Sequence, residues 1–288
     1  MTLTTESAVS GIEDQSGNNK NYINTTSGYL VALDVDGTLV DHDGHMSDTV
    51  RNAARKVVAA GHDVVIATGR SLGAVLPVLE LIGLDRGYGV CSNGAVTIRI
   101  DPGLDLGYEI IDRETFNPRH ALTTLREKIP GARFALEDAE GNFLSTERFQ
   151  DPSFGIEARG VDFHHLLDAT AVRVVVNSAD ASTAEFAAAI DDAGLHGVAY
   201  AVGWSAWVDI AADGVTKATA LEKIRRRLGV DQGQTVAVGD GTNDLEMLRW
   251  AGRGVAMGQA DAVVQNAANE VTGSVYDDGL ATVLHSLL

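Results

Sequence analysis

The sequence predicts an α/β protein whose parallel-sheet core is interrupted by an inserted α+β unit. Short apolar runs alternate with helical patterns over residues 28–99, which is typical of strand–helix–strand units on a parallel sheet. Near residue 100 this alternation gives way to short strand-like runs separated by turns, and it resumes over 205–288. We therefore expect a discontinuous core domain of residues 28–99 and 205–288, with an inserted domain of residues 100–204.

The first part of the core is expected to alternate strands and helices. The apolar run "YLVALDV" predicts the first strand, and Ser47 is placed to cap the helix that follows. "HDVVIAT" predicts the second strand, and a helix over about 71–82 follows it, with Pro77 bending that helix. "GYGVCSNGAVTI" predicts a third strand and a turn at Asn93-Gly94.

The inserted unit is expected to be an antiparallel sheet with helices. The runs "DPGLDLGYEIID", "RFALED" and "NFLSTER" predict strands of this sheet. Asn117-Pro118 opens a helix, because Asn caps well and Pro suits the first helical position. "AVRVVVNS" and "GVAYAVGW" predict further strands on either side of an Ala-rich helix near residues 182–193.

The remaining runs are expected to complete the core. "AWVDIA" is predicted to lead back into it, followed by a helix over about 215–228 and the buried strand "TVAVGD". "DLEMLRWA" begins another helix. "GVAMG", a helix from Asp261 and the terminal "DGLATVLHSLL" then form the sheet edge.

Composition limits the partners and the compartment. Lys plus Arg number 22 against 40 Asp plus Glu, and this formal charge of -18 argues against nucleic-acid and anionic-membrane surfaces. The single cysteine, Cys91, permits no intrachain disulfide and favours a reducing compartment. Residues 1–27 are polar, and no run approaches the roughly 18 apolar residues of a membrane span. We expect a flexible tail over 1–27 and a cytoplasmic protein that is a monomer or a weak homo-oligomer.

Polar residues gather where predicted strands end or helices begin. In open parallel sheets, ligands bind outside the carboxyl ends of the strands. Any one of these groups occurs often by chance, whereas their coincidence at such positions is specific. The groups are Asp34 with Asp36, Thr68 with Gly69, Lys217, and the run "GDGTND" at residues 239–244.

The paired acids predict a cation site. Asp34 and Asp36 end a buried strand two residues apart, so their side chains point the same way and repel each other. A divalent cation shared with Asp240 cancels that repulsion, and oxygen ligands suit Mg²⁺. One carboxylate can then attack phosphorus while the other gives a proton to the leaving oxygen.

The other polar groups fit the same chemistry. Lys217 offers a positive charge to the transferred phosphoryl group, and Thr68 with the N–H of Gly69 suits a phosphate oxygen at a helix start. Each also has an ordinary structural interpretation when taken alone. Lys217 fits a surface lysine, and "GDGTND" fits a Gly-rich turn with a helix cap.

The motifs resemble those of a known superfamily. Asp34-Val35-Asp36-Gly37-Thr38, Thr68-Gly69-Arg70, Gly214-Val215-Thr216-Lys217 and Gly239-Asp240-Gly241-Thr242-Asn243-Asp244 resemble the four motifs of the haloacid dehalogenase (HAD) superfamily. Their order and spacing are similar to those of its Cof-type (class IIB) phosphatases. The resemblance implies a Rossmann-like α/β core and a large C2-type α+β cap inserted between the second and third motifs.

The resemblance also implies roles for individual residues. Asp34 is the implied nucleophile, which forms an aspartyl-phosphate, and Asp36 is the implied general acid and then base. Mg²⁺ is implied to bind the Asp34 side chain, the Asp36 carbonyl and the Asp240 side chain, with Asp244 as an outer ligand or orienting acid. The implied substrate-binding residues are Thr68, Gly69, Asn93, Gly94 and Asn243, and Lys217 is implied to balance charge.

The leading hypothesis is a Mg²⁺-dependent phosphatase acting on a small phosphorylated metabolite, either a sugar phosphate or a phosphorylated cofactor precursor. The cap is expected to close over the substrate and set specificity. One alternative is a phosphomutase of the phosphomannomutase type, which would require a bisphosphate activator. Another is a non-catalytic metabolite-binding regulator, although a pure binder has no need of the general acid Asp36.

Overall fold

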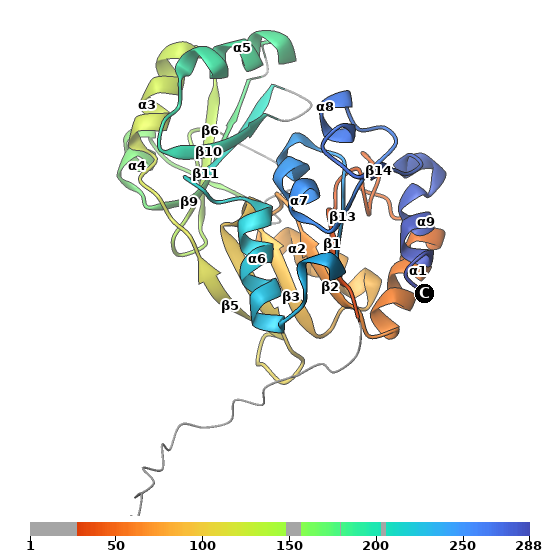
Figure 1. Ribbon diagram of the computed structural model, residues 1–288. Helices are drawn as coiled ribbons and strands as arrows, with labels where there is room; N and C mark the ends of the chain where they lie inside the picture. Colours follow the sequence, from red (N-terminus) through yellow and green to blue (C-terminus); the bar gives the residue numbers. More distant parts are fainter. Residues whose placement is uncertain (1–27, 148–156, 179, 203–205) are drawn as a thin grey trace, which may run out of the picture.

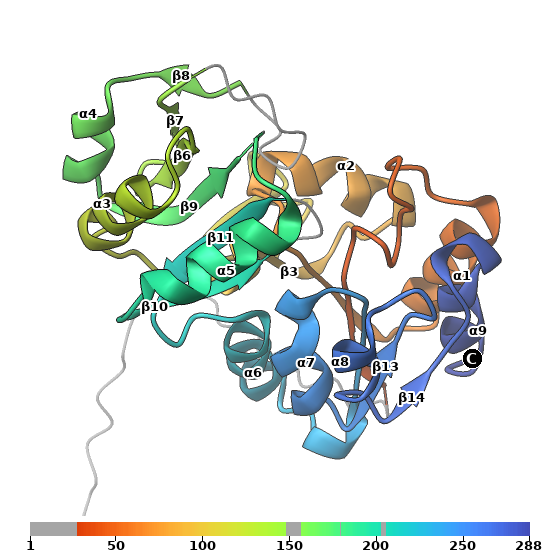
Figure 2. The same ribbon diagram turned by 90° about the horizontal axis from the view of Figure 1, so that it is seen from above.

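The computed structural model describes residues 28–147, 157–178, 180–202 and 206–288, which form two sheets with helices packed against them (Figure 1). In both views the smaller sheet and its helices form a lobe beside the larger one (Figure 2). Among the described helices, none has both the length and the apolar character needed to cross a bilayer. The predicted tail of residues 1–27 and the predicted boundary at residue 204 lie outside the described residues.

The larger sheet is mainly parallel. Its first six strands in spatial order pair in parallel, and the last two extend it as antiparallel edge strands. The order is β14 (Glu270–Val271), β13 (Arg253–Ala256), β12 (Thr235–Gly239), β1 (Leu30–Leu33), β2 (Asp63–Ala67), β3 (Gly87–Cys91), β4 (Val96–Ile100) and β5 (Tyr108–Arg113).

Helices cover both faces of this sheet. Val31 and Leu33 of β1 pack in one cluster, Leu30 and Ala32 pack in another, and this division explains why the strand is an unbroken apolar run. The first face carries α1 (Asp48–Ala59), α2 (Leu72–Ile82) and α9 (Gly279–His285). The second face carries α6 (Lys217–Leu228) and α7 (Leu245–Trp250), and α8 (Ala262–Gln265) packs beside α7.

The smaller sheet is antiparallel except for its last strand pair. Three helices cover the face that lies away from the larger sheet (Figure 1). The strand order is β10 (Val198–Val202), β11 (Trp207–Ala212), β9 (Ala171–Asn177), β6 (Arg133–Asp138), β7 (Phe143–Ser145) and β8 (Arg159–Gly160), and the helices are α3 (Arg119–Lys128), α4 (Phe163–Asp168) and α5 (Thr183–Ala193).

Two strand assignments made from the sequence are wrong. The run "DPGLDLGYEIID" contains β5, which pairs with β4 in the larger sheet rather than joining the inserted sheet. The run "AWVDIA" is β11, which pairs with β10 and β9 in the smaller sheet rather than in the core. Both errors have one cause, since a strand joins the sheet in which it finds a partner and that partner is not encoded locally. We infer that the insertion spans residues 114–212 rather than 100–204.

Candidate active site

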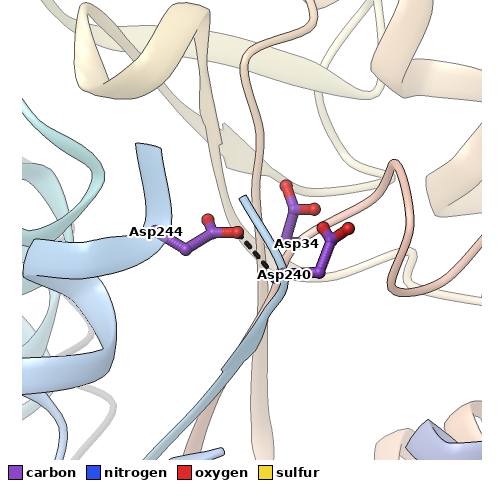
Figure 3. A group of neighbouring side chains, drawn as sticks. All are labelled: Asp34, Asp240 and Asp244. Atoms are coloured by element: carbon purple, nitrogen blue, oxygen red, sulfur yellow. Dashed lines mark hydrogen bonds between the residues drawn. The ribbon is translucent and has the colours of Figure 1, made fainter. Parts of the chain in front are cut away.

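Asp34 and Asp240 follow adjacent parallel strands at the carboxyl edge of the larger sheet. The backbone N–H of Asp34 donates to the carbonyl of Val238 at 3.0 Å, which fixes the two strand ends side by side. Both side chains are buried, with 4% and 5% of the residue exposed. Figure 3 shows their carboxylates pointing in the same direction, so the sheet brings together the first and fourth sequence motifs.

Asp244 approaches this pair from the turn before α7 (Figure 3). Its Oδ2 accepts from the backbone N–H groups of Asp240 and Gly241, both at 3.0 Å. Its Oδ1 accepts from Nζ of Lys217 at 2.6 Å. Asp244 therefore holds the loop that carries Asp240, which fits the predicted role of an orienting acid.

Lys217 is the first residue of α6, and its side chain is fully buried. Thr216 caps the helix, because its Oγ1 accepts from the N–H of Thr219 at 3.2 Å. Nζ of Lys217 donates to Oδ1 of Asp34 at 2.7 Å. Burial lowers the pKa of Lys217, but the charges of Asp244 and Asp34 outweigh it, so the pKa is raised and the ammonium stays charged.

The carboxylates outnumber the single ammonium. Burial raises the pKa of Asp34 to about 7, with the charge of Asp244 adding to the rise and Lys217 opposing it. Burial and the charge of Asp34 raise the pKa of Asp240 to about 8. Oxygens of Asp34, Asp240 and Asp244 lie within 4.8 Å of one another. When ionised, the three carboxylates and the one ammonium leave a net negative charge that one divalent cation would balance. An all-oxygen donor set suits a hard ion such as Mg²⁺.

Gly37 leaves room for the Asp240 carboxylate. Its φ is +78°, and an added Cβ would meet Oδ2 of Asp240 at 2.1 Å. Nε2 of Gln259 donates to the carbonyl of Gly37 at 2.6 Å and reaches Oδ2 of Asp240 at 3.3 Å. Gln259, which no sequence motif indicated, therefore ties the loop after β1 to the carboxylate beside it.

Asp36 lies in the same loop but is turned toward solvent, with 53% of its side chain exposed. Arg70, in the loop after β2, forms a two-point ion pair with Asp36, with Nε 2.9 Å from Oδ2 and Nη2 2.5 Å from Oδ1. The structure thus places Asp36 on the same cavity as Asp34 and Asp240 and pairs it with Arg70. Arg70 belongs to the second motif but had no predicted role, and its adjacency to Thr68-Gly69 is the signal that could have indicated one.

The five predicted substrate-binding residues fall into two groups. Gly69, Asn93 and Asn243 line cavities, and Nδ2 of Asn243 donates to Oδ1 of Asn93 at 3.0 Å. Thr68 is fully buried, and its Oγ1 accepts from the N–H of Arg70 at 3.1 Å. Gly94 packs so closely on α6 that an added Cβ would meet the Thr216 carbonyl oxygen at 2.3 Å. Thr68 and Gly94 are not among the described residues that line the two cavities, and their contact with substrate stays a prediction.

Two cavities that share lining residues lie between the larger and the smaller sheet. The smaller, of about 150 Å³, is lined by Asp34, Asp36 and Asp240, and the larger measures about 460 Å³. Arg173 of β9 and Asp209 of β11 line both, with Nε of Arg173 2.6 Å from Oδ1 of Asp209. Sequence reasoning missed this pair, although a single charge inside each of the apolar runs "AVRVVVNS" and "AWVDIA" was a visible signal.

Comparison with known proteins agrees with this architecture. A family model of haloacid dehalogenase-like hydrolases matches residues 31–284. The chain is 28% identical over 275 residues to 5-amino-6-(5-phospho-D-ribitylamino)uracil phosphatase YitU of Bacillus subtilis (strain 168), covering 90% of this chain and 97% of that one. It is 30% identical over 256 residues to a phosphoglycolate phosphatase of Methanoculleus marisnigri, covering 86% and 92%.

A solved structure extends the similarity to the whole fold. The HAD subclass IIB sugar phosphatase BT4131 matches with a TM-score of 0.73 at 23% identity, covering 90% of this chain and 100% of that chain. At this identity the match shows the fold alone. Together the family match and the two sheets confirm the predicted α/β core with an inserted α+β unit, and the chain belongs to the haloacid dehalogenase-like hydrolases.

Proposed function

We propose that this chain is a Mg²⁺-dependent phosphatase that hydrolyses a small phosphorylated metabolite, a sugar phosphate or a phosphorylated cofactor precursor, through an aspartyl-phosphate on Asp34. The observation that carries the proposal is the buried carboxylate of Asp34, which lies against Lys217 and beside Asp240 where the small cavity opens. Relatives named as phosphatases of a ribitylaminouracil phosphate and of phosphoglycolate support a small phosphate ester as substrate.

The residues of the site suggest two chemical steps. In the first, an Asp34 oxygen forms a bond to phosphorus, the bond from phosphorus to the leaving oxygen breaks, and Asp36 gives that oxygen its proton. In the second, Asp36 takes a proton from water as the water oxygen attacks phosphorus. The bond between Asp34 and phosphorus then breaks, which releases inorganic phosphate and restores the carboxylate. Asp36 can exchange its proton with solvent because its side chain is 53% exposed.

A divalent cation fits among the carboxylates that this mechanism uses. The side chains of Asp34 and Asp240 and the carbonyl of Asp36 would hold it, while Asp244 keeps the loop of Asp240 in place. When bound, Mg²⁺ supplies positive charge that offsets the carboxylates and attracts phosphoryl oxygens. Lys217 contributes a second positive charge beside Asp34, which favours the ionised carboxylate that attack requires.

Phosphate release from a panel of phosphorylated metabolites tests the proposal. The measurement compares the wild-type chain in Mg²⁺ and in EDTA with the Asp34→Asn and Asp43→Asn variants. Asp34→Asn should lose about a thousandfold of the activity or more, because the nucleophile is gone. Asp43→Asn removes an exposed carboxylate from the nearby loop and should retain full activity.

Two outcomes would contradict this function. Equal activity of Asp34→Asn and the wild type would remove Asp34 as the nucleophile. A requirement for a bisphosphate activator, with little net release of phosphate, would instead favour the phosphomutase alternative.

A further inference from the structure

Three charged residues lie in a row on the face of the smaller sheet that is turned toward the larger sheet. Side chains alternate along a strand, so the register places Glu137 of β6, Arg173 of β9 and Asp209 of β11 on one face. Their neighbours on this face form a small cluster of Ala135, Phe143, Val175 and Trp207. The opposite face packs against α3, α4 and α5 through apolar residues such as Leu136, Val174 and Ile210. The charges therefore lie where the smaller sheet meets the site.

Arg173 and Asp209 form a fixed pair at the junction of the two cavities. Nε of Arg173 lies 2.6 Å from Oδ1 of Asp209, and the Arg173 side chain is only 3% exposed. Asp209 is more open, with 18% of its side chain exposed, and Nε1 of Trp207 reaches its Oδ2 at 3.3 Å. Together with Asn243, the pair lines both the cavity that holds Asp34 and the larger one beside it. A phosphate ester bound at Asp34 would therefore place its leaving group against Asp209.

The charges around the larger cavity favour some leaving groups over others. Among the described lining residues, its carboxylates are Asp209 and Glu246, and its cations are Arg173 and Lys217. Lys217 is fully buried against Asp34 and Asp244, and Arg173 already contacts Asp209. A hydroxyl or amino group can donate to the Asp209 carboxylate. A second anionic group in this cavity would lie near the carboxylates of Asp209 and Glu246, and like charges repel.

We propose that Asp209, held in place by Arg173, is a specificity-determining residue that selects phosphate monoesters with an uncharged, hydroxyl-bearing leaving group. It disfavours esters whose leaving group carries a carboxylate or a second phosphate. This inference rests on the proposed phosphatase function and adds to it the charge class of the substrate. The Asp209 carboxylate would act in both directions. It would accept a hydrogen bond from a hydroxyl group and repel an anionic group, and specificity depends on the difference between the two affinities.

A matched pair of esters tests the proposal. Sorbitol phosphate and phosphogluconate, each phosphorylated on the terminal carbon, differ at the opposite end, where one carries a hydroxymethyl group and the other a carboxylate. Each is measured as a competitive inhibitor of the hydrolysis of p-nitrophenyl phosphate in Mg²⁺. The wild-type chain should bind sorbitol phosphate at least about tenfold more tightly than phosphogluconate.

Three variants test whether discrimination between the two esters depends on carboxylates at the cavity or on the overall charge of the protein. Asp209→Asn keeps the shape of the side chain and should reduce the discrimination about tenfold. Glu246→Gln alters an exposed residue at the start of α7, so it should fold normally and reduce the discrimination by a smaller factor. Asp192→Asn removes the same charge from α5, where Asp192 pairs with Lys128, and should leave the discrimination within about twofold.

The outcomes that overturn the inference differ from those that overturn the function. Equal inhibition by the two esters, no inhibition by either, or unchanged discrimination in Asp209→Asn would each overturn it, even with normal hydrolysis of p-nitrophenyl phosphate. No release of phosphate from any ester would overturn the phosphatase function itself.

Discussion

Lys217 offsets part of the buried negative charge at the centre of the site. Its ammonium contacts Asp34 and Asp244, and all three side chains are at most 6% exposed. Lys217→Met keeps an unbranched side chain but leaves two buried carboxylates without their ammonium. We expect the free energy of unfolding in EDTA to fall by about 3–5 kcal/mol, the usual cost of breaking a buried ion pair. Urea unfolding measures this loss.

Lys223 on the same helix provides the matched control. It pairs with Asp112 and Glu114, but its side chain is 55% exposed. Lys223→Met should cost no more than about 1 kcal/mol, because solvent screens exposed pairs. Equal losses in the two variants would mean that burial of Lys217 contributes nothing to stability.

Gly37→Ala tests whether the loop after β1 must leave space for Asp240. An added Cβ would meet Oδ2 of Asp240 at 2.1 Å, so the carboxylate must move. We expect Mg²⁺ affinity to fall by about 10–100-fold, the usual effect of disturbing a group that positions a metal ligand. Calorimetric titration with Mg²⁺ measures this change.

Gly44→Ala isolates the backbone contribution to that effect. Gly44 has a φ of +81°, close to the +78° of Gly37, but an added Cβ there would meet no atom within 4 Å. Both variants should therefore lose about 1–2 kcal/mol of stability from the left-handed backbone, while Gly44→Ala keeps its Mg²⁺ affinity. A similar loss of affinity in both variants would point to backbone strain rather than contact with Asp240.

For single residues, the sequence predicts the position in the site of those that lie in short motifs. Asp34 and Asp240 each follow a fully buried strand that is mostly apolar, so their placement at the sheet edge is a local property. Arg173 and Asp209 could not be predicted in the same way. Their position facing the site depends on the register of β9 with β11 and on how the smaller sheet packs over the larger, and both are long-range properties.

Lys217 is the first residue of α6, so the cap of this helix should affect both the stability of the protein and its phosphatase activity. Thr216 and Thr219 form reciprocal hydrogen bonds between side chain and backbone at this helix start. We expect Thr216→Ala to cost about 1 kcal/mol of stability. Because Lys217 is the next residue, phosphate release should also fall, and a thermal melt with an activity assay measures the two effects.

The N-terminal cap of α5 provides the control for the cap of α6. Ser182 and Glu185 form the equivalent capping box, and neither lines the two cavities. Ser182→Ala should cost a similar amount of stability while phosphate release stays unchanged. If Thr216→Ala also kept full activity, the cap of α6 would have only a structural role.

Helix starts depend on local sequence, and their predictions came close. Ser47 caps α1 as expected, with its Oγ accepting from the N–H of Val50 at 3.1 Å, whereas the N-cap of α3 is Pro118 rather than the expected Asn117. Caps act within a few residues, so the sequence locates a helix start to within roughly one or two residues. The strands β5 and β11 were assigned to the wrong sheets, because an apolar run is compatible with pairing in either sheet.

At the scale of the whole molecule, the two cavities are lined by residues from both sheets. Oγ of Ser92, in the turn after β3, donates to Oε2 of Glu137 on β6 at 2.9 Å, and both groups are buried. Burial raises the pKa of Glu137, and the hydrogen bond from Ser92 opposes this rise. Ser92 precedes Asn93, which lines the larger cavity. This contact therefore connects the smaller sheet to the loop that borders the substrate cavity.

The charge of the buried carboxylates predicts how stability depends on pH and on Mg²⁺. The pKa values of Asp34 and Asp240 rise from the ordinary 3.8 to about 7 and about 8. Between pH 4 and pH 8 these groups bind more protons in the folded chain than in the unfolded one. Their contribution to the free energy of unfolding therefore falls as pH rises through this window in EDTA.

Mg²⁺ should reverse this trend, because it binds the ionised carboxylates and only the folded chain holds them together. At a concentration about one hundred times its Kd, the ion adds about 2.7 kcal/mol, which corresponds to a rise in Tm of about 5–10 °C. We expect this rise at pH 8 and a much smaller one at pH 5, where protons compete for the ligands. Calorimetry of the wild-type chain and of Asp240→Asn measures both effects, and the variant should show a weaker fall with pH in EDTA and a smaller gain from Mg²⁺. A gain of equal size at both pH values, or in both proteins, would place the ion somewhere other than among these carboxylates.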